Sequence, residues 1–171
     1  MDLMALSQLA QILGGAAVVI ALVFGMVQIH QFRRQRHDVA AIELMRSLQD
    51  KEFTHSFRLI YPLPVDMPVD AFRALGPEYE DAALALGARF ESMGLLVYRD
   101  SLPMHLVEEI IGGAVVILWM RLRPWVEANR QEQRHPVLFE WFQWLAERLD
   151  ERGRPTETPA YQRFRDWKPK R

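Results

Sequence analysis

The sequence predicts an all-α protein in which one N-terminal transmembrane helix continues into a cytoplasmic helical bundle. Leu3–Phe32 contains no Asp, Glu, Lys or Arg. After this stretch, apolar residues recur at helical spacing, which is typical of helices with one buried face. Prolines and glycines divide the chain into segments of helical length. We therefore expect a transmembrane anchor at residues 1–32, a cytoplasmic helical domain at residues 33–153 and a basic flexible tail at residues 154–171.

The uncharged N-terminal stretch is long enough to cross a bilayer. Leu9–Ile29 has 21 residues, and about 20 apolar residues, each rising about 1.5 Å, cover a hydrocarbon layer of about 30 Å. A cleaved signal peptide would carry positive charge before the apolar run, where this chain has only Asp2. Small residues that share one side of the helix predict close packing against another span. They are Ala10, Gly14, Ala17, Ala21 and Gly25.

Basic residues immediately after the span predict its orientation. Arg33, Arg34 and Arg36 follow the span, whereas no Lys or Arg precedes it. Because positive residues favour the cytoplasmic side, we expect the N-terminus outside and the helical domain in the cytoplasm. The same arginines can bind anionic head groups, at about 1 kcal/mol each near a charged surface.

The first cytoplasmic helices are predicted from caps and prolines. The transmembrane helix is expected to continue to Gln49, and Asp50 then fits the N-cap of a second helix. Three prolines follow this helix, so Tyr61–Met67 is expected to be an extended loop. A short helix over Val69–Leu75 is expected to stop at Gly76. The next helix has the clearest apolar seam. Its members are Tyr79, Ala83, Leu86, Phe90, Met93 and Val97.

The second half of the chain predicts two more helices and the tail. Pro103 fits the first turn of a helix that includes the apolar run Ile110–Met120, which is too short to span a bilayer. Gly112, Gly113 and Ala114 would let a neighbour approach this central helix, and Pro124 would bend or interrupt it. A last helix is expected from Pro136 to Gly153. The tail holds six Lys or Arg and two acids, with three aromatic residues able to dock it on the bundle or the membrane. These are Tyr161, Phe164 and Trp167.

Composition excludes several function classes. The chain has no Cys, which excludes disulfides, a thiol nucleophile and cysteine-ligated metals. Its formal net charge of −1 does not favour nucleic acid as a partner. No phosphate loop, nucleophile elbow or zinc-protease helix occurs. We therefore expect no cofactor and identify no small-molecule substrate.

Two Glu-x-x-His pairs are the only candidate metal ligands, namely Glu52 with His55 and Glu132 with His135. In di-iron bundles two such pairs, with a Glu from each of two other helices, project into the core. Glu91 and Glu108 are the available partners. The first pair lies at a predicted helix start and the second lies in a charged stretch. Both pairs are therefore better explained as solvated charges than as metal ligands. Glu91 itself lies beside the seam, where it is expected to be a buried acid or to pair with Arg99 or Arg121.

Several motifs together resemble an uncharacterised bacterial family of single-span membrane proteins with a helical cytoplasmic domain. They are the uncharged span, Gln31-Phe32-Arg33-Arg34, Leu48–Tyr61, Arg89-Phe90-Glu91-Ser92-Met93-Gly94-Leu95-Leu96-Val97-Tyr98-Arg99, Gly112-Gly113, Trp119 and Arg123-Pro124-Trp125. The resemblance covers most of the chain. It implies the fold, the single-pass topology and a bacterial inner membrane, and it supplies no activity, cofactor or catalytic residue.

These observations favour an interaction, scaffold or accessory role at the inner face of a membrane, with the lipid bilayer and a second copy or another membrane protein as partners. A metal-dependent helical-bundle enzyme is the first alternative, and it predicts bound iron, manganese or zinc that is lost on His55→Ala or His135→Ala. An anionic-lipid sensor is the second, and it predicts salt-sensitive vesicle binding by residues 33–171.

Overall fold

A computed structural model describes residues 15, 21–26, 28, 39, 42–153 and 160–169. The chain divides into two compact units, Met1–Ala40 and Ala41–Arg171. In the first unit the described residues are helical, and Leu22, Val23, Phe24 and Met26 are exposed. Most of the predicted span Leu9–Ile29 lies outside the described residues. Among the residues that are described, no helix is both long and apolar enough to cross a membrane.

The second unit begins with two short helical stretches. Residues 42–48 are helical, as expected for this part of the chain. The next helix, α2 (Lys51–Ile60), has Asp50 as its N-cap, and the Asp50 carboxylate accepts a hydrogen bond from the backbone N–H of Glu52 at 3.4 Å. This confirms the predicted cap. Phe53 and Ile60 are buried on the inner face of α2.

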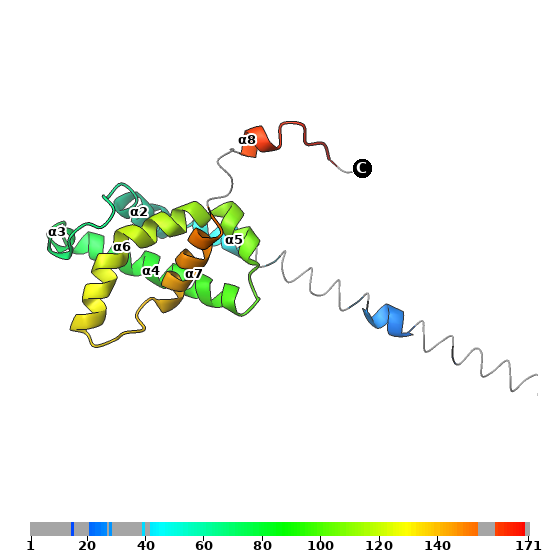
Figure 1. Ribbon diagram of the computed structural model, residues 1–171, viewed down its shortest axis with the longest axis horizontal. Coiled ribbons are helices and arrows are strands. Elements are labelled where there is room, and N and C mark those ends of the chain that lie inside the picture. Colours follow the sequence, from blue (N-terminus) through cyan, green and yellow to red (C-terminus); the bar gives the residue numbers. More distant parts are fainter. Residues whose placement is uncertain are drawn as a thin grey trace, which may run out of the picture. The chain divides into compact units, whose positions relative to one another are not determined.

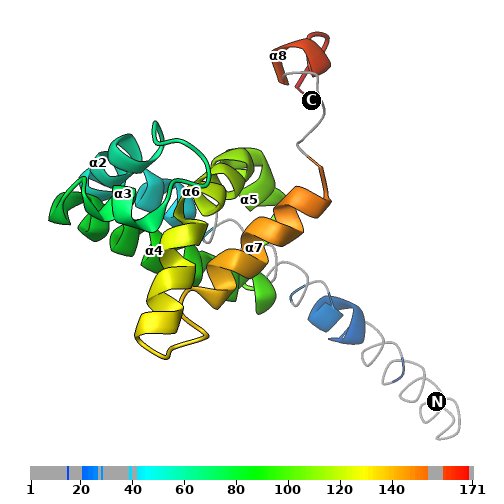
Figure 2. The same ribbon diagram turned by 60° about the vertical axis from the view of Figure 1, so that its left-hand side comes forward.

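Helix α4 is the centre of the domain and carries the predicted seam. The short α3 (Val69–Arg73) ends two residues earlier than expected, and α4 runs over Pro77–Tyr98 with Gly76 before it at a left-handed φ of 107°. The seam is confirmed, since five of its six members are buried. They are Ala83, Leu86, Phe90, Met93 and Val97. Helix α4 packs against α2 and α7, which lie beside it in Figures 1 and 2.

The helix predicted from Pro103 through Met120 is in fact two helices. Helix α5 covers Met104–Ile110 and α6 covers Gly112–Glu132. Ile111 separates them with φ −145° and ψ 1°. Two consecutive glycines follow this break, and each costs a helix roughly 1 kcal/mol relative to alanine, so the chain departs from helical geometry most readily here.

Pro124 bends α6 without interrupting it. The helix continues past Pro124 for eight residues to Glu132, and Figure 1 shows it changing direction part-way along its length. A proline has no N–H for the carbonyl one turn earlier, so a bend is the expected response.

The last helix of the bundle starts later than predicted. Helix α7 covers Glu140–Glu151, not a stretch opening at Pro136. Phe139, just before it, is buried and left-handed at φ 55°. A Cβ added to Gly87 would lie 2.6 Å from the Phe139 ring, so this ring occupies the space that the glycine leaves open. Burying the ring therefore fixes a backbone conformation that starts the helix only at Glu140.

The core lies between α4, α6 and α7. The ring of Phe142 is 5.0 Å from that of Phe90 and 5.2 Å from that of Trp119, measured between centroids. Beyond α7, a short helix α8 covers Ala160–Arg163 in the predicted tail.

Candidate functional site

The structure does not bring the four candidate metal ligands together. Glu52, His55, Glu132 and His135 are all exposed. The Nε2 atom of His55 lies 3.1 Å from Oε1 of Glu78 at the start of α4. Within the described ranges, no group of three or more His, Cys, Asp or Glu residues could hold a metal ion. The arrangement required for a di-iron bundle is therefore not formed by these residues.

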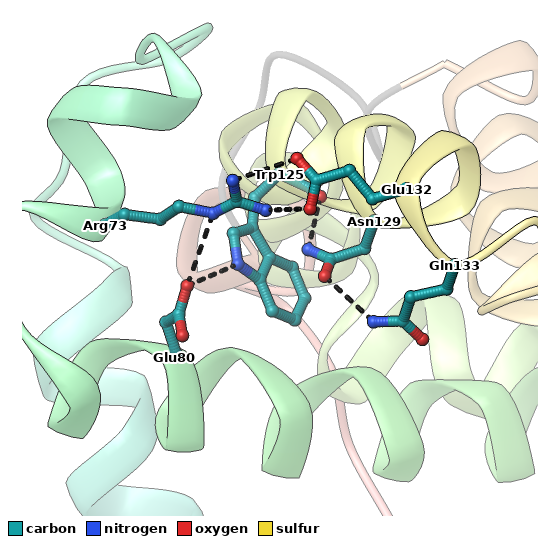
Figure 3. A network of polar contacts seen from close by, with 6 residues as sticks. All are labelled: Arg73, Glu80, Trp125, Asn129, Glu132 and Gln133. Carbon is teal, nitrogen blue, oxygen red and sulfur yellow. Dashed lines mark hydrogen bonds and ion pairs between the residues drawn. The ribbon is translucent and has the colours of Figure 1, made fainter.

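Glu132 instead takes part in an ion pair that joins α3 to α6. Arg73 donates from both terminal guanidinium nitrogens to the Glu132 carboxylate, at 2.9 and 2.6 Å. These hydrogen bonds lower the pKa of Glu132 below its usual value. Figure 3 shows that Arg73 also approaches Glu80 of α4, at 3.6 Å, and that Glu80 accepts from the Trp125 indole at 3.4 Å. The network connects three helices through partly exposed side chains, and its role is structural.

Glu91 is a cap for α7, and neither Arg99 nor Arg121 is its partner. Its carboxylate accepts from the backbone N–H of Phe142 at 2.9 Å and also from that of Trp141. Phe139, at the N-cap position, provides no side-chain cap, so a residue of α4 satisfies the free N–H groups of α7. Burial raises the pKa of Glu91, and the two backbone hydrogen bonds oppose this rise.

The expected arginine partners of Glu91 lie elsewhere. Arg121 donates from Nε to the carbonyl of Leu63 at 2.5 Å, and its guanidinium lies 4.7 Å from the centroid of the Tyr61 ring. Arg99 caps the C-terminal end of α4. The predicted pairing of Glu91 with Arg99 or Arg121 is therefore wrong, whereas the alternative of an acid shielded from water agrees with its raised pKa.

An open groove of about 550 Å³ lies beside the start of α6. We call it the glycine groove, because Gly112 and Gly113 at the start of α6 form part of its floor. The side chains around it come from residues 48–58 and 108–114. They are Leu48, Phe53, Thr54, Phe57, Arg58, Glu108, Glu109, Ile110, Ile111 and Ala114. This volume is in the range of ligand sites, about 300–1,000 Å³, but the groove is wide open.

Among the described residues, the neighbour expected beside the glycine pair covers Gly112 but not Gly113. A Cβ added to Gly113 would meet no atom within 4 Å, whereas one on Gly112 would meet Leu149 at 3.5 Å. One glycine is thus covered by α7 and the other faces the groove. A smaller depression of about 90 Å³ continues from Gly113 to Asp150. The Gly-Gly pair was the sequence signal for this surface.

The predicted membrane-facing residues are only partly within the described structure. Ala10, Gly14, Ala17 and all three arginines, Arg33, Arg34 and Arg36, lie outside it. Ala21 and Gly25 are within a helical stretch, and a Cβ added to Gly25 would meet nothing within 4 Å. The packing role of the small-residue stripe stays a prediction.

Comparison with known proteins gives one match. Residues 12–149 match the family model described as "Domain of unknown function (DUF4760)". No curated protein and no solved structure shows significant similarity. The match covers most of the chain, including Gly112 and Gly113, and it agrees with the uncharacterised family expected from the motifs.

Proposed function

We propose that this chain, which belongs to the family of the DUF4760 domain of unknown function, is a membrane-anchored helical scaffold that assembles with a second copy of itself. The uncharged stretch Leu3–Phe32 supports the anchor. The arginines that follow it support a domain at the inner face of a bacterial membrane.

The observation that carries the self-assembly is an apolar stripe that leads into the glycine groove. Ile42, Met45 and Leu48 lie three residues apart along residues 42–48, so they share one helix face. Ile42 is 49% exposed and Met45 is 44% exposed, while Leu48 is part of the groove wall. The stripe and the groove thus form one continuous, largely apolar surface of the domain.

A second copy is the occupant that this surface fits best. Only residues 33–41 separate the stripe from the predicted anchor in the chain, so two anchored copies carry the same stripe at a similar distance from the membrane. A two-fold dimer uses one patch on both partners, with a protruding side chain of each entering the hollow of the other. Packing of the small-residue stripe within the lipid would raise the local concentration of the two domains and strengthen this contact.

The oligomeric state of the intact protein tests the proposal. We expect a dimer in mild detergent by light scattering, and we expect Met45→Asp to weaken it at least about tenfold, which corresponds to roughly 1.4 kcal/mol. Val137→Asp is the matched control, because Val137 is a similarly exposed apolar residue, at 48%, outside the groove. A monomeric wild type, a different protein bound in place of the second copy, or equal behaviour of the two variants would contradict the proposal.

A further inference from the structure

The C-terminal segment, residues 160–169, exposes aromatic side chains. Tyr161 is 75% exposed, Phe164 is 53% exposed and Trp167 is 69% exposed. Of these, Tyr161 belongs to α8 and Phe164 to the turn that follows it. The three residues recur at intervals of three, a spacing that gathers them on one side of a tight helical turn. Large aromatic side chains in contact with water indicate a surface that binds something apolar.

Positive charge is concentrated in the same part of the chain. Residues 154–171 contain six Lys or Arg and two acids, a net charge of +4, whereas the whole chain has −1, which leaves −5 for residues 1–153. Arg165 and Lys168 are interleaved with the aromatic residues and are exposed. The tail therefore differs in charge from the rest of the molecule.

We infer that residues 160–169 bind the surface of an anionic bilayer, with Tyr161, Phe164 and Trp167 at the level of the head groups and the basic side chains paired with lipid phosphates. Tyr and Trp are favoured at this depth because their rings are apolar and their polar atoms reach water. Each nearby Lys or Arg adds about a fivefold increase in affinity for an anionic surface. The inference rests on the proposed anchor only in that the anchor holds the tail near lipid.

The segment has two candidate binding surfaces, a lipid bilayer and the domain itself. Residues 154–159 separate Gly153 from α8, and six residues span up to about 20 Å when extended. The competing destination is the domain itself, because Glu108 and Glu109 border the glycine groove and Asp150 borders the depression that continues it. A lipid surface is favoured because it accommodates aromatic and basic side chains in alternation. In addition, Glu108 is already paired with Arg152 at 3.3 Å, so its carboxylate is not free to bind the basic tail.

A fluorophore on an introduced cysteine tests the inference, because the chain has no cysteine of its own. The full-length protein carrying Gln162→Cys, labelled with a polarity-sensitive dye, is reconstituted into phosphatidylcholine vesicles with or without phosphatidylglycerol. We expect a blue shift and quenching by brominated lipid only with phosphatidylglycerol, both reversed by high salt. Arg165→Gln with Lys168→Gln should lower the affinity about 25-fold, at about fivefold for each charge. A dye on Ala74→Cys, an exposed residue of the bundle, is the control.

Two results would overturn the inference. Emission from position 162 that is the same in both lipids and unquenched would show that the segment stays in water. A blue shift that is independent of lipid and salt and is lost on Gly113→Trp would show that the segment docks in the glycine groove. Alkaline extraction of the vesicles tests the anchor separately. If the protein is extracted, the same labelled protein is titrated with added vesicles, and the lipid dependence still decides the inference.

Discussion

The glycines of α4 and those at the start of α6 differ in how they are packed. Those of α4 are covered by α7 and by Phe139 just before it, whereas Gly113 of α6 is covered by no described residue. On α4, Gly87 and Gly94 are both buried, one under the Phe139 ring and the other against the backbone of Trp141. At the start of α6, Gly113 faces the open groove, and a Cβ added to it would meet no atom of the described residues within 4 Å. In the first case the missing side chains let α7 approach α4 closely. A glycine in a helix therefore allows another element to pack closely against it. Whether an element of the same chain does so depends on the position of the neighbouring helix.

The largest effect is expected for Gly94→Ala, which tests the closed surface. The added methyl would collide with the main chain of Trp141, and a backbone cannot move aside as a flexible side chain can. We expect a loss of about 3 kcal/mol in the free energy of unfolding, the upper part of the range for overpacking. Chemical denaturation of the detergent-solubilised protein, followed by circular dichroism, measures it. Stability equal to that of the wild type would show that α4 and α7 are not in close contact.

A smaller loss is expected for Glu91→Ala, which tests the same interface through its hydrogen bonds. Removing the carboxylate leaves the N–H groups of Trp141 and Phe142 without their partner, and loss of a cap costs about 1 kcal/mol. Glu127→Ala is the control, since Glu127 is exposed and lies 4.0 Å from Arg123 as its nearest cation. The same denaturation experiment should separate the two variants clearly. Equal stability would contradict the capping role.

The pH dependence of stability should also depend on Glu91. Because burial raises its pKa in the folded state, the folded protein binds the proton more tightly than the unfolded chain. The resulting contribution to stability is complete below the unfolded pKa of about 4.5 and decreases as the pH rises through the higher folded pKa. We expect Glu91→Gln to remove this decrease. Parallel pH profiles of wild type and variant over this window would contradict the assignment.

The smallest effect is expected for Gly113→Ala on the open surface. Within one chain no described atom lies within 4 Å of the added methyl, so in a Met45→Asp background, where the proposed dimer is weakened, only helix propensity changes and the domain should become more stable by about 0.5 to 1 kcal/mol. Thermal unfolding measures this gain. Since Gly94→Ala gains the same propensity, the difference between the two variants reports the packing cost alone. A marked loss of stability for Gly113→Ala would mean that the groove is filled in the protein.

Local patterns in the sequence were sufficient for much of the fold. The seam of α4 follows from helical periodicity, and the Asp50 cap follows from a single side chain and the helix after it. Both depend on residues close together in the chain. The start of α7 could not be predicted in this way, because it depends on Phe139 filling the space beside Gly87, and burial there outweighs the preference of Pro136 for a helix start.

The candidate sites were harder to predict because their interactions join residues that are far apart in the chain. Arg73 and Glu132 are 59 positions apart, and nothing local indicates that Glu132 meets an arginine and not a metal ion. The cap provided by Glu91 is equally remote, at 51 positions from Phe142. The break at Ile111 had a local signal in the two glycines that follow it, but the length of the apolar run outweighed it in the prediction.

The separation of 51 positions between Glu91 and Phe142 also affects how the chain folds while it is synthesised. Helix α4 leaves the ribosome with its apolar seam uncovered, and α7, which covers it, is translated about 50 residues later. At a rate of roughly 5–20 residues per second, this delay is about 3–10 seconds. The nascent chain therefore passes through an interval in which α4 has α2 beside it but lacks α7, so the side of Phe90 that packs on Phe142 is uncovered, and chaperone binding to newly made chains should be concentrated there.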